Sequence, residues 1–116
     1  NKNVSIVDSF NPTEPGDTFI SMYNNINPTK DNPLILVMEE IDIIIENITL
    51  NKIQAHKYLP IQIKSKIDWN MFLDRFDRNL YKNIIIIFTT NKSKSYFDNL
   101  DKSYFRKGRI SLEFNL

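Results

Sequence analysis

The sequence predicts an α/β domain in which helices flank a parallel sheet. Two runs that contain only apolar residues, Leu34–Met38 and Ile84–Phe88, have the length and composition of strands buried on both faces. Segments with helical periodicity precede each of these runs, and strands that alternate with helices form parallel sheets with right-handed crossovers. The 116 residues are enough for one small domain.

The first predicted strand covers residues 3–7, a β-prone run that the segment NPTEPGD interrupts with its prolines and glycine. Asp17 or Thr18 can then cap a helix, which Pro28 ends. Three apolar side chains repeat at i, i+4 and i+7 along one face of this helix: Phe19, Tyr23 and Ile26. The run Leu34–Met38 follows as the second strand.

The region 46–66 is polar, contains Pro60, and is interpreted as an insertion or a flexible connection. Within it, residues 58–63 fit either a strand or an extended loop. A clear helix then begins at Asp68. Its apolar face is formed by residues at i, i+3, i+4, i+7 and i+11: Trp69, Phe72, Leu73, Phe76 and Leu80. We expect Trp69 to lie in the core rather than in a base-stacking platform.

The last part of the chain supplies the second apolar run and two shorter elements. After Ile84–Phe88, a short helix is predicted at residues 101–105, and residues 110–114 alternate weakly and are predicted as a last strand. The predicted order is β-α-β-insertion-α-β-α-β, in a single domain that spans residues 1–116.

Composition excludes several kinds of site. The chain has no cysteine, which rules out disulfides, thiolate metal sites and a cysteine nucleophile, and its one histidine cannot form a histidine-rich zinc site. No run of about 18 apolar residues occurs, so we expect no transmembrane segment and take an intracellular location as the default. The residues from Lys82 onward are locally basic, but they lack an interleaved aromatic platform, so no nucleic-acid partner is expected.

Polar residues follow both apolar runs at the point where each predicted strand ends. Glu39 and Glu40 follow the first run, and Asn91 follows two threonines after the second. Taken alone, an acidic pair in this position is more often a strand end that reaches solvent. However, ligands of open parallel sheets bind at the carboxyl ends of the strands, where both polar sets would share one crevice. Carboxylates suit Mg²⁺, and a second carboxylate can orient water for attack on a phosphoryl group.

Three segments together resemble the second half of the nucleotide-binding core of AAA+ ATPases, over residues 4–114. ILVMEEID resembles the Walker B segment, IIIIFTTN the sensor-1 strand with its terminal asparagine, and LDKSYFRKGRI the second region of homology. The resemblance implies a P-loop NTPase-like parallel sheet with flanking helices. The chain most resembles the branch of Bcs-type chaperones, which often carry an insertion after Walker B.

The resemblance also implies roles for individual residues. Glu39 takes the position of the carboxylate that organises Mg²⁺, where most members have Asp. Glu40 takes the position of the general base that polarises the attacking water beside ATP, and Asn91 that of the sensor-1 asparagine. Arg106 and Arg109 take the positions of two arginines that reach into a neighbouring subunit's site, which implies an oligomeric ring.

One part of the nucleotide site is missing from the sequence. The only glycines are Gly16 and Gly108, and no G-x-x-x-x-G-K-[ST] motif is present to cradle phosphates. The family places the P-loop, its strand and its helix before this segment, so we expect an N-terminal P-loop half on a longer polypeptide or a partner, and no activity from this chain alone. The implied function is ATP hydrolysis coupled to remodelling or translocation of a protein substrate. The alternative is a hydrolysis-incompetent AAA-like scaffold module.

Overall fold

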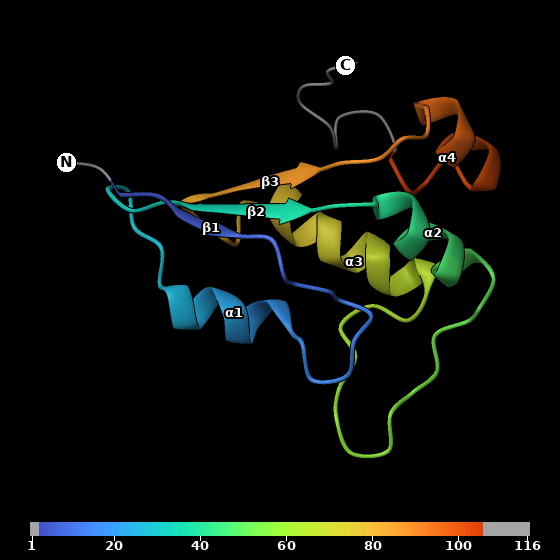
Figure 1. Ribbon diagram of the computed structural model, residues 1–116, viewed down its shortest axis with the longest axis horizontal. Helices are drawn as coiled ribbons and strands as arrows, with labels where there is room; N and C mark the ends of the chain where they lie inside the picture. The colour runs from blue at the N-terminus through green and yellow to red at the C-terminus, as the bar shows by residue number, and fades with distance from the viewer. Residues whose placement is uncertain (1–2, 106–116) are drawn as a thin grey trace.

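A computed structural model of the chain describes residues 3–105 (Figure 1), and within them it confirms an α/β fold with a parallel sheet and flanking helices. The finer P-loop NTPase-like classification stays a prediction. The strand predicted at 110–114 lies outside the described residues. The elements in chain order are β1 Ser5–Val7, α1 Phe19–Ile26, β2 Leu34–Met38, α2 Ile41–Thr49, α3 Lys66–Asp77, β3 Ile84–Phe88 and α4 Lys94–Leu100.

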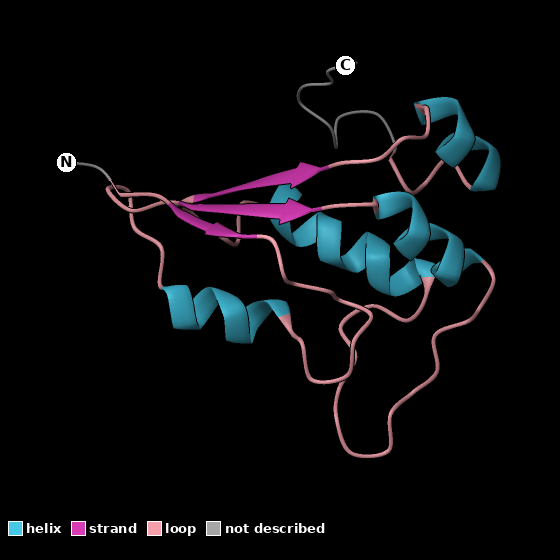
Figure 2. Ribbon diagram, viewed as in Figure 1, coloured by secondary structure: helices cyan, strands magenta, loops and turns pink. Residues whose placement is uncertain are grey.

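The described sheet has the strand order β1-β2-β3, and both neighbouring pairs are parallel (Figure 2). Ile35 of β2 pairs with Ile6 on one side and with Ile85 on the other. The chain therefore crosses from strand to neighbouring strand through helical segments, as the alternation of elements predicts.

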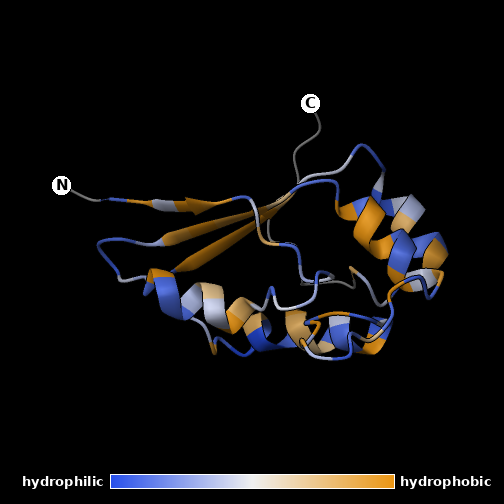
Figure 3. Ribbon diagram, turned by 60° about the horizontal axis from the view of Figure 1, so that its bottom comes forward, coloured by the Kyte–Doolittle hydropathy of each residue, from blue (hydrophilic) through white to orange (hydrophobic). Residues whose placement is uncertain are grey.

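The hydrophobic core lies between one face of the sheet and the helices α1 and α3 (Figure 3), and it continues to buried residues of α2 and α4. Every second residue of β2 points to this side and is almost fully buried: Leu34, Leu36 and Met38. Phe19 from α1 and Phe72 from α3 meet there edge to face, with ring centroids 5.6 Å apart. Trp69 is fully buried, which confirms the prediction of a core residue.

Helix α1 has the predicted bounds, although the side chain of Thr18 makes no capping hydrogen bond at its start. Thr18 precedes it in an extended conformation, and Asn27 follows it in the left-handed region at φ 51°. The Asn27 backbone N–H donates to the Tyr23 carbonyl, and Pro28 cannot continue the helix.

Helix α2 is an element that the sequence analysis did not predict. Its residues Ile41, Ile45 and Ile48 are spaced by four and three positions and are all buried. The sequence analysis missed this helical spacing because isoleucine favours strands and because polar residues follow the isoleucines. Of the region 46–66, residues 46–49 thus complete a helix, and residues 50–65 contain no helix or strand, including the ambiguous residues 58–63.

Helix α3 starts two residues before the predicted start at Asp68. Ser65 caps it by accepting a hydrogen bond from the Asp68 backbone N–H, and the Asp68 carboxylate accepts one from the Lys64 backbone N–H. This reciprocal arrangement resembles a capping box. At the other end, Asn79 adopts φ 57°, so Leu80 lies outside the helix and is exposed, contrary to the prediction.

The prediction of a short helix at residues 101–105 is wrong. The helix in this part of the chain, α4, lies just before those residues, at Lys94–Leu100. Ser93 caps this helix by accepting a hydrogen bond from the Tyr96 backbone N–H. Asp101 is extended at φ −172°, and its side chain accepts a hydrogen bond from the Ser103 backbone N–H. The aspartate therefore ends α4 and starts a turn instead of capping a new helix.

Candidate functional site

The candidate site lies at the carboxyl edge of the sheet, where the chain leaves β2 and β3. The two strands are parallel neighbours, and their last residues, Met38 and Phe88, are paired. Beyond them, the Thr89 backbone N–H donates to the Met38 carbonyl, and the Ile41 N–H donates to the Thr89 carbonyl. The two polar termini are therefore held side by side, as the sequence predicts.

Glu40 has an unusual backbone conformation for a glutamate. It precedes α2 with φ 52° and ψ 46°, in the left-handed region. Five non-glycine residues between 3 and 105 have positive φ, and the other four are all asparagine, which tolerates this region. The left-handed region strains a glutamate, and such strain clusters at functional sites.

Glu39 and Glu40 border a pocket of about 230 Å³ that faces the loop after β1. Both side chains are exposed, and Asp8 brings a third carboxylate to the rim. Asn91 does not line this pocket, although it follows the neighbouring strand. The residues that line it are Asp8, Ser9, Phe10, Asn11, Met38, Glu39, Glu40, Ile43 and Ile44.

A further acidic residue, Asp42, links the ends of the two strands. It is the one charged side chain that is buried in the described part of the chain, with 9% of its surface exposed. Its Oδ1 accepts a hydrogen bond of 2.9 Å from the Thr90 hydroxyl, and the same hydroxyl accepts one from the Lys92 backbone N–H. These bonds position the chain on both sides of Asn91. The sequence analysis gave Asp42 no role, although its place between isoleucines in EEIDII signals a buried acid.

The donor set fits Mg²⁺ only in part. Mg²⁺ is usually bound by one or two carboxylates, and waters and phosphate oxygens complete its coordination. Glu39 and Glu40 can supply the carboxylates. Over residues 3–105, no three acidic or histidine side chains are arranged to hold a metal ion without such additional ligands. The described residues also lack a glycine-rich loop, so they supply no cradle for phosphates. Arg106 and Arg109 lie outside the described residues.

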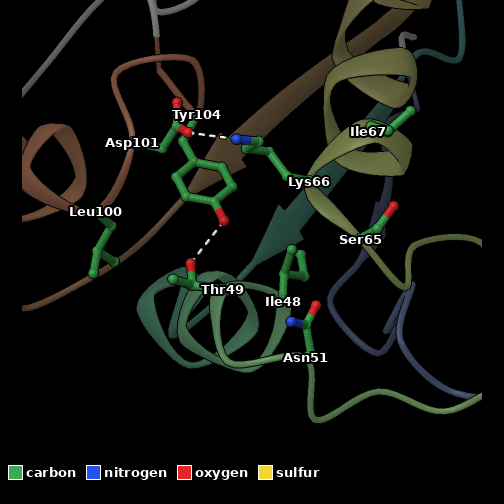
Figure 4. A pocket seen from close by; sticks show the side chains of 9 residues that line it. All are labelled: Ile48, Thr49, Asn51, Ser65, Lys66, Ile67, Leu100, Asp101 and Tyr104. Atoms are coloured by element: carbon green, nitrogen blue, oxygen red, sulfur yellow. Dashed lines mark hydrogen bonds and ion pairs between the residues drawn. The ribbon is translucent and has the colours of Figure 1, made fainter.

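A second pocket, of about 340 Å³, lies between the end of α2, the start of α3 and the turn after α4 (Figure 4). Four of its polar side chains are paired with one another. The Lys66 ammonium lies 2.6 Å from the Asp101 carboxylate, and the hydroxyls of Thr49 and Tyr104 lie 2.6 Å apart. Nearby, the Tyr96 hydroxyl donates to Glu46, which joins α4 to α2 and raises the pKa of Tyr96 to about 12. We interpret these contacts as structural.

We expect the Lys66–Asp101 ion pair to make stability depend on acid pH. The hydrogen bond from Lys66, followed by that from the Ser103 N–H, lowers the pKa of Asp101 from 3.8 to about 2. Because the folded-state pKa lies below the unfolded one, the stabilisation is fully present above pH 4 and is lost as the pH falls toward 2. Asp101→Asn should lower the thermal unfolding midpoint by a few degrees at pH 6, and the difference from wild type should vanish near pH 2. An equal difference at both pH values would contradict this assignment.

No family model, no curated protein and no solved structure matches this chain. Among the described residues, no helix is long and apolar enough to cross a membrane.

Proposed function

We propose that the chain is part of the core of an AAA+ ATPase and carries the groups that organise Mg²⁺ and the attacking water. The observation that supports this most is the pairing of β2 with β3. It brings the acidic pair and Asn91 to one edge of a parallel sheet, which is where such sheets bind their ligands. The strained backbone at Glu40 is a second, independent support.

In this proposal each residue has a distinct role. Glu39 would hold Mg²⁺, which would neutralise charge on the phosphate oxygens, and Glu40 would accept a proton from the water that attacks the terminal phosphoryl group of ATP and releases ADP. Asn91 donates a hydrogen bond to that phosphoryl group or to the water. Asp42 and Thr90 act through Asn91, as positioning residues that fix the chain around it.

The remaining groups of the site come from elsewhere. An N-terminal P-loop half of the same domain supplies the phosphate cradle. Arg106 and Arg109 serve the site of the adjacent subunit in a homo-oligomeric ring. ATP hydrolysis in that ring drives the remodelling or translocation of a protein substrate.

The test uses the protein expressed from its full reading frame. We expect wild type to hydrolyse ATP and Asn91→Ala to lower kcat at least tenfold, because one hydrogen bond made in the transition state is lost. Binding of a fluorescent ATP analogue should change little. Asn25→Ala, on the exposed side of α1, is the matched control and should behave as wild type.

Two other results are informative. A wild-type protein that binds ATP without hydrolysing it would support the scaffold alternative. Normal turnover in Asn91→Ala would remove the asparagine from the site.

Arg106→Ala should lower turnover at least tenfold as well. An inactive Glu40→Gln subunit mixed with this variant should restore part of the activity by supplying an intact arginine.

A further inference from the structure

The segment between β3 and α4 carries Asn91, and helix α2 is bonded to the chain on both sides of this residue. Before Asn91, the Thr90 hydroxyl donates to Asp42 of α2. After it, α4 lies beside α2 (Figure 1), and the Tyr96 hydroxyl of α4 donates to the Glu46 carboxylate of α2. The segment is therefore tied to one helix at two points.

The second of these points has the features of a firm contact. Tyr96 and Glu46 are both partly buried, so water competes less for their hydrogen bond than it would at an open surface. The hydrogen bond to Glu46, followed by burial and by the charges of Glu46 and Asp42, raises the pKa of Tyr96 to about 12. The phenol therefore stays protonated and remains the donor at neutral pH. The Lys92 ammonium also lies 5.2 Å from the centre of the Tyr96 ring.

Helix α2 also fixes the start of the other candidate group. It begins directly after Glu40, and Asp42 and Glu46, four positions apart, project from the same side of it. The backbone of Glu40 and both contacts to the segment of Asn91 are thus set by one short helix. Precise spacing matters in catalysis, because a misplacement of about 1 Å can cost about 100-fold in rate.

We infer that Tyr96 and Glu46 form a clamp that positions Asn91 relative to Glu40. Both are positioning residues: they hold the α4 end of the segment, opposite the end that Asp42 and Thr90 hold, and neither is assigned a contact with the nucleotide. The expected effect of the clamp on turnover rests on the proposed function. Its effect on the segment itself can be measured without nucleotide.

A second tyrosine bonded to α2 provides a matched control. The Tyr104 hydroxyl lies 2.6 Å from the hydroxyl of Thr49, which also belongs to α2. Because the Thr49 hydroxyl donates to the Ile45 carbonyl, Tyr104 is the donor in this pair, as Tyr96 is in the clamp. The Tyr104 backbone is held separately, since its carbonyl accepts the indole N–H of Trp69. A change of either tyrosine to phenylalanine thus removes one hydrogen bond to α2, but only Tyr96 belongs to the helix that directly follows the segment.

Hydrogen exchange of the protein made from its full reading frame tests the clamp without nucleotide. The readout is the Lys92 backbone N–H, which is bonded to the Thr90 hydroxyl within the segment. We expect Tyr96→Phe to speed its exchange about tenfold, the effect of losing a hydrogen bond to a charged acceptor, and Tyr104→Phe to leave it unchanged. Glu46→Gln keeps an oxygen that can accept the bond and should restore slow exchange, whereas Glu46→Ala should exchange as fast as Tyr96→Phe. Unchanged exchange in Tyr96→Phe, or an equal increase in Tyr104→Phe, would overturn the inference.

Steady-state turnover of the same variants tests the consequence for catalysis. Tyr96→Phe should lower kcat about tenfold and leave the binding of a fluorescent ATP analogue unchanged, because the clamp affects the placement of Asn91 and not the affinity for ATP. Tyr104→Phe should keep the wild-type kcat. Faster exchange of Lys92 with a wild-type kcat would overturn the positioning role. If wild type shows no ATPase activity, the proposed function fails, and the exchange of Lys92 still decides whether the clamp holds the segment.

Discussion

Glu40→Gln should lower the ATP turnover of the full-length protein by at least 100-fold while leaving ATP binding nearly unchanged. Glutamine keeps the size and hydrogen-bonding reach of the side chain but cannot accept a proton from water. General-base catalysis of this kind is worth about 10²–10⁴ in rate. The measurement is steady-state turnover together with binding of a fluorescent ATP analogue. Glu14→Gln, an exposed glutamate in the loop before α1, is the matched control and should keep wild-type turnover.

The backbone of Glu40 provides a second readout that a surface glutamate would not give. A left-handed conformation costs a residue with a β-carbon about 1–2 kcal/mol. Glycine removes that cost but loses about 0.5–1 kcal/mol through its freedom in the unfolded chain. Glu40→Gly should therefore match or exceed the stability of wild type, by up to about 1 kcal/mol, while its turnover falls as far as that of Glu40→Gln.

The opposite pattern would contradict the proposal. If Glu40→Gly destabilises the protein and Glu40→Gln leaves turnover unchanged, the glutamate is a structural residue at the start of α2. Gain of stability with loss of activity is the expected signature of strain that is kept for function.

Apolar runs made most of the sheet predictable. Leu34–Met38 and Ile84–Phe88 are five-residue runs without a polar side chain, and the structure gives them the predicted bounds as strands. Their parallel pairing followed from the alternation of strands with helices. The prediction that these strands are buried on both faces is wrong for β3 within the described residues, where Ile85 and Ile87 are 59% and 43% exposed. A continuous apolar run looks the same in the sequence whether one or both of its faces are covered.

The helices were harder to predict because tertiary burial and caps decide their positions. Ile41, Ile43, Ile44 and Ile45 favour strands intrinsically, yet burial of Ile41 and Ile45 against the core selects a helix. In the same way, Asp101 reads as a helix start but its carboxylate bonds the N–H two residues on. A side chain's choice of backbone partner cannot be read from residue type alone.

The sequence predicted which strands end at the carboxyl edge of the sheet, but not the backbone conformation and hydrogen bonds at that edge. The positions of Glu39, Glu40 and Asn91 follow from where two apolar runs end. The left-handed turn at Glu40 and the hydrogen bond from Thr90 to Asp42 depend on how α2 leaves the sheet, and α2 itself was not predicted. The edge of the sheet where the candidate residues lie could therefore be predicted from the sequence, but the local geometry at that edge could not.

The largest expected effect on stability comes from Trp69, which joins helix α3 to the end of β3. Its side chain is fully buried and lies with its ring centroid 5.8 Å from those of both Phe88 and Phe105. Its indole N–H donates a hydrogen bond of 3.1 Å to the Tyr104 carbonyl. Trp69→Ala should lower the free energy of unfolding by about 3–5 kcal/mol, because it removes this packing and leaves a cavity.

Two further variants separate packing from hydrogen bonding in this prediction. Trp69→Phe keeps a ring but orphans the buried carbonyl, so it should cost about 1–3 kcal/mol. Met71→Ala, at a position of the same helix that is 53% exposed, should stay within about 0.5 kcal/mol of wild type. Urea unfolding should be followed by circular dichroism, since the substitutions remove the only tryptophan. Because Phe88 immediately precedes Thr89, a loss below 1 kcal/mol in Trp69→Ala would mean that α3 does not support the strand end that carries the candidate site.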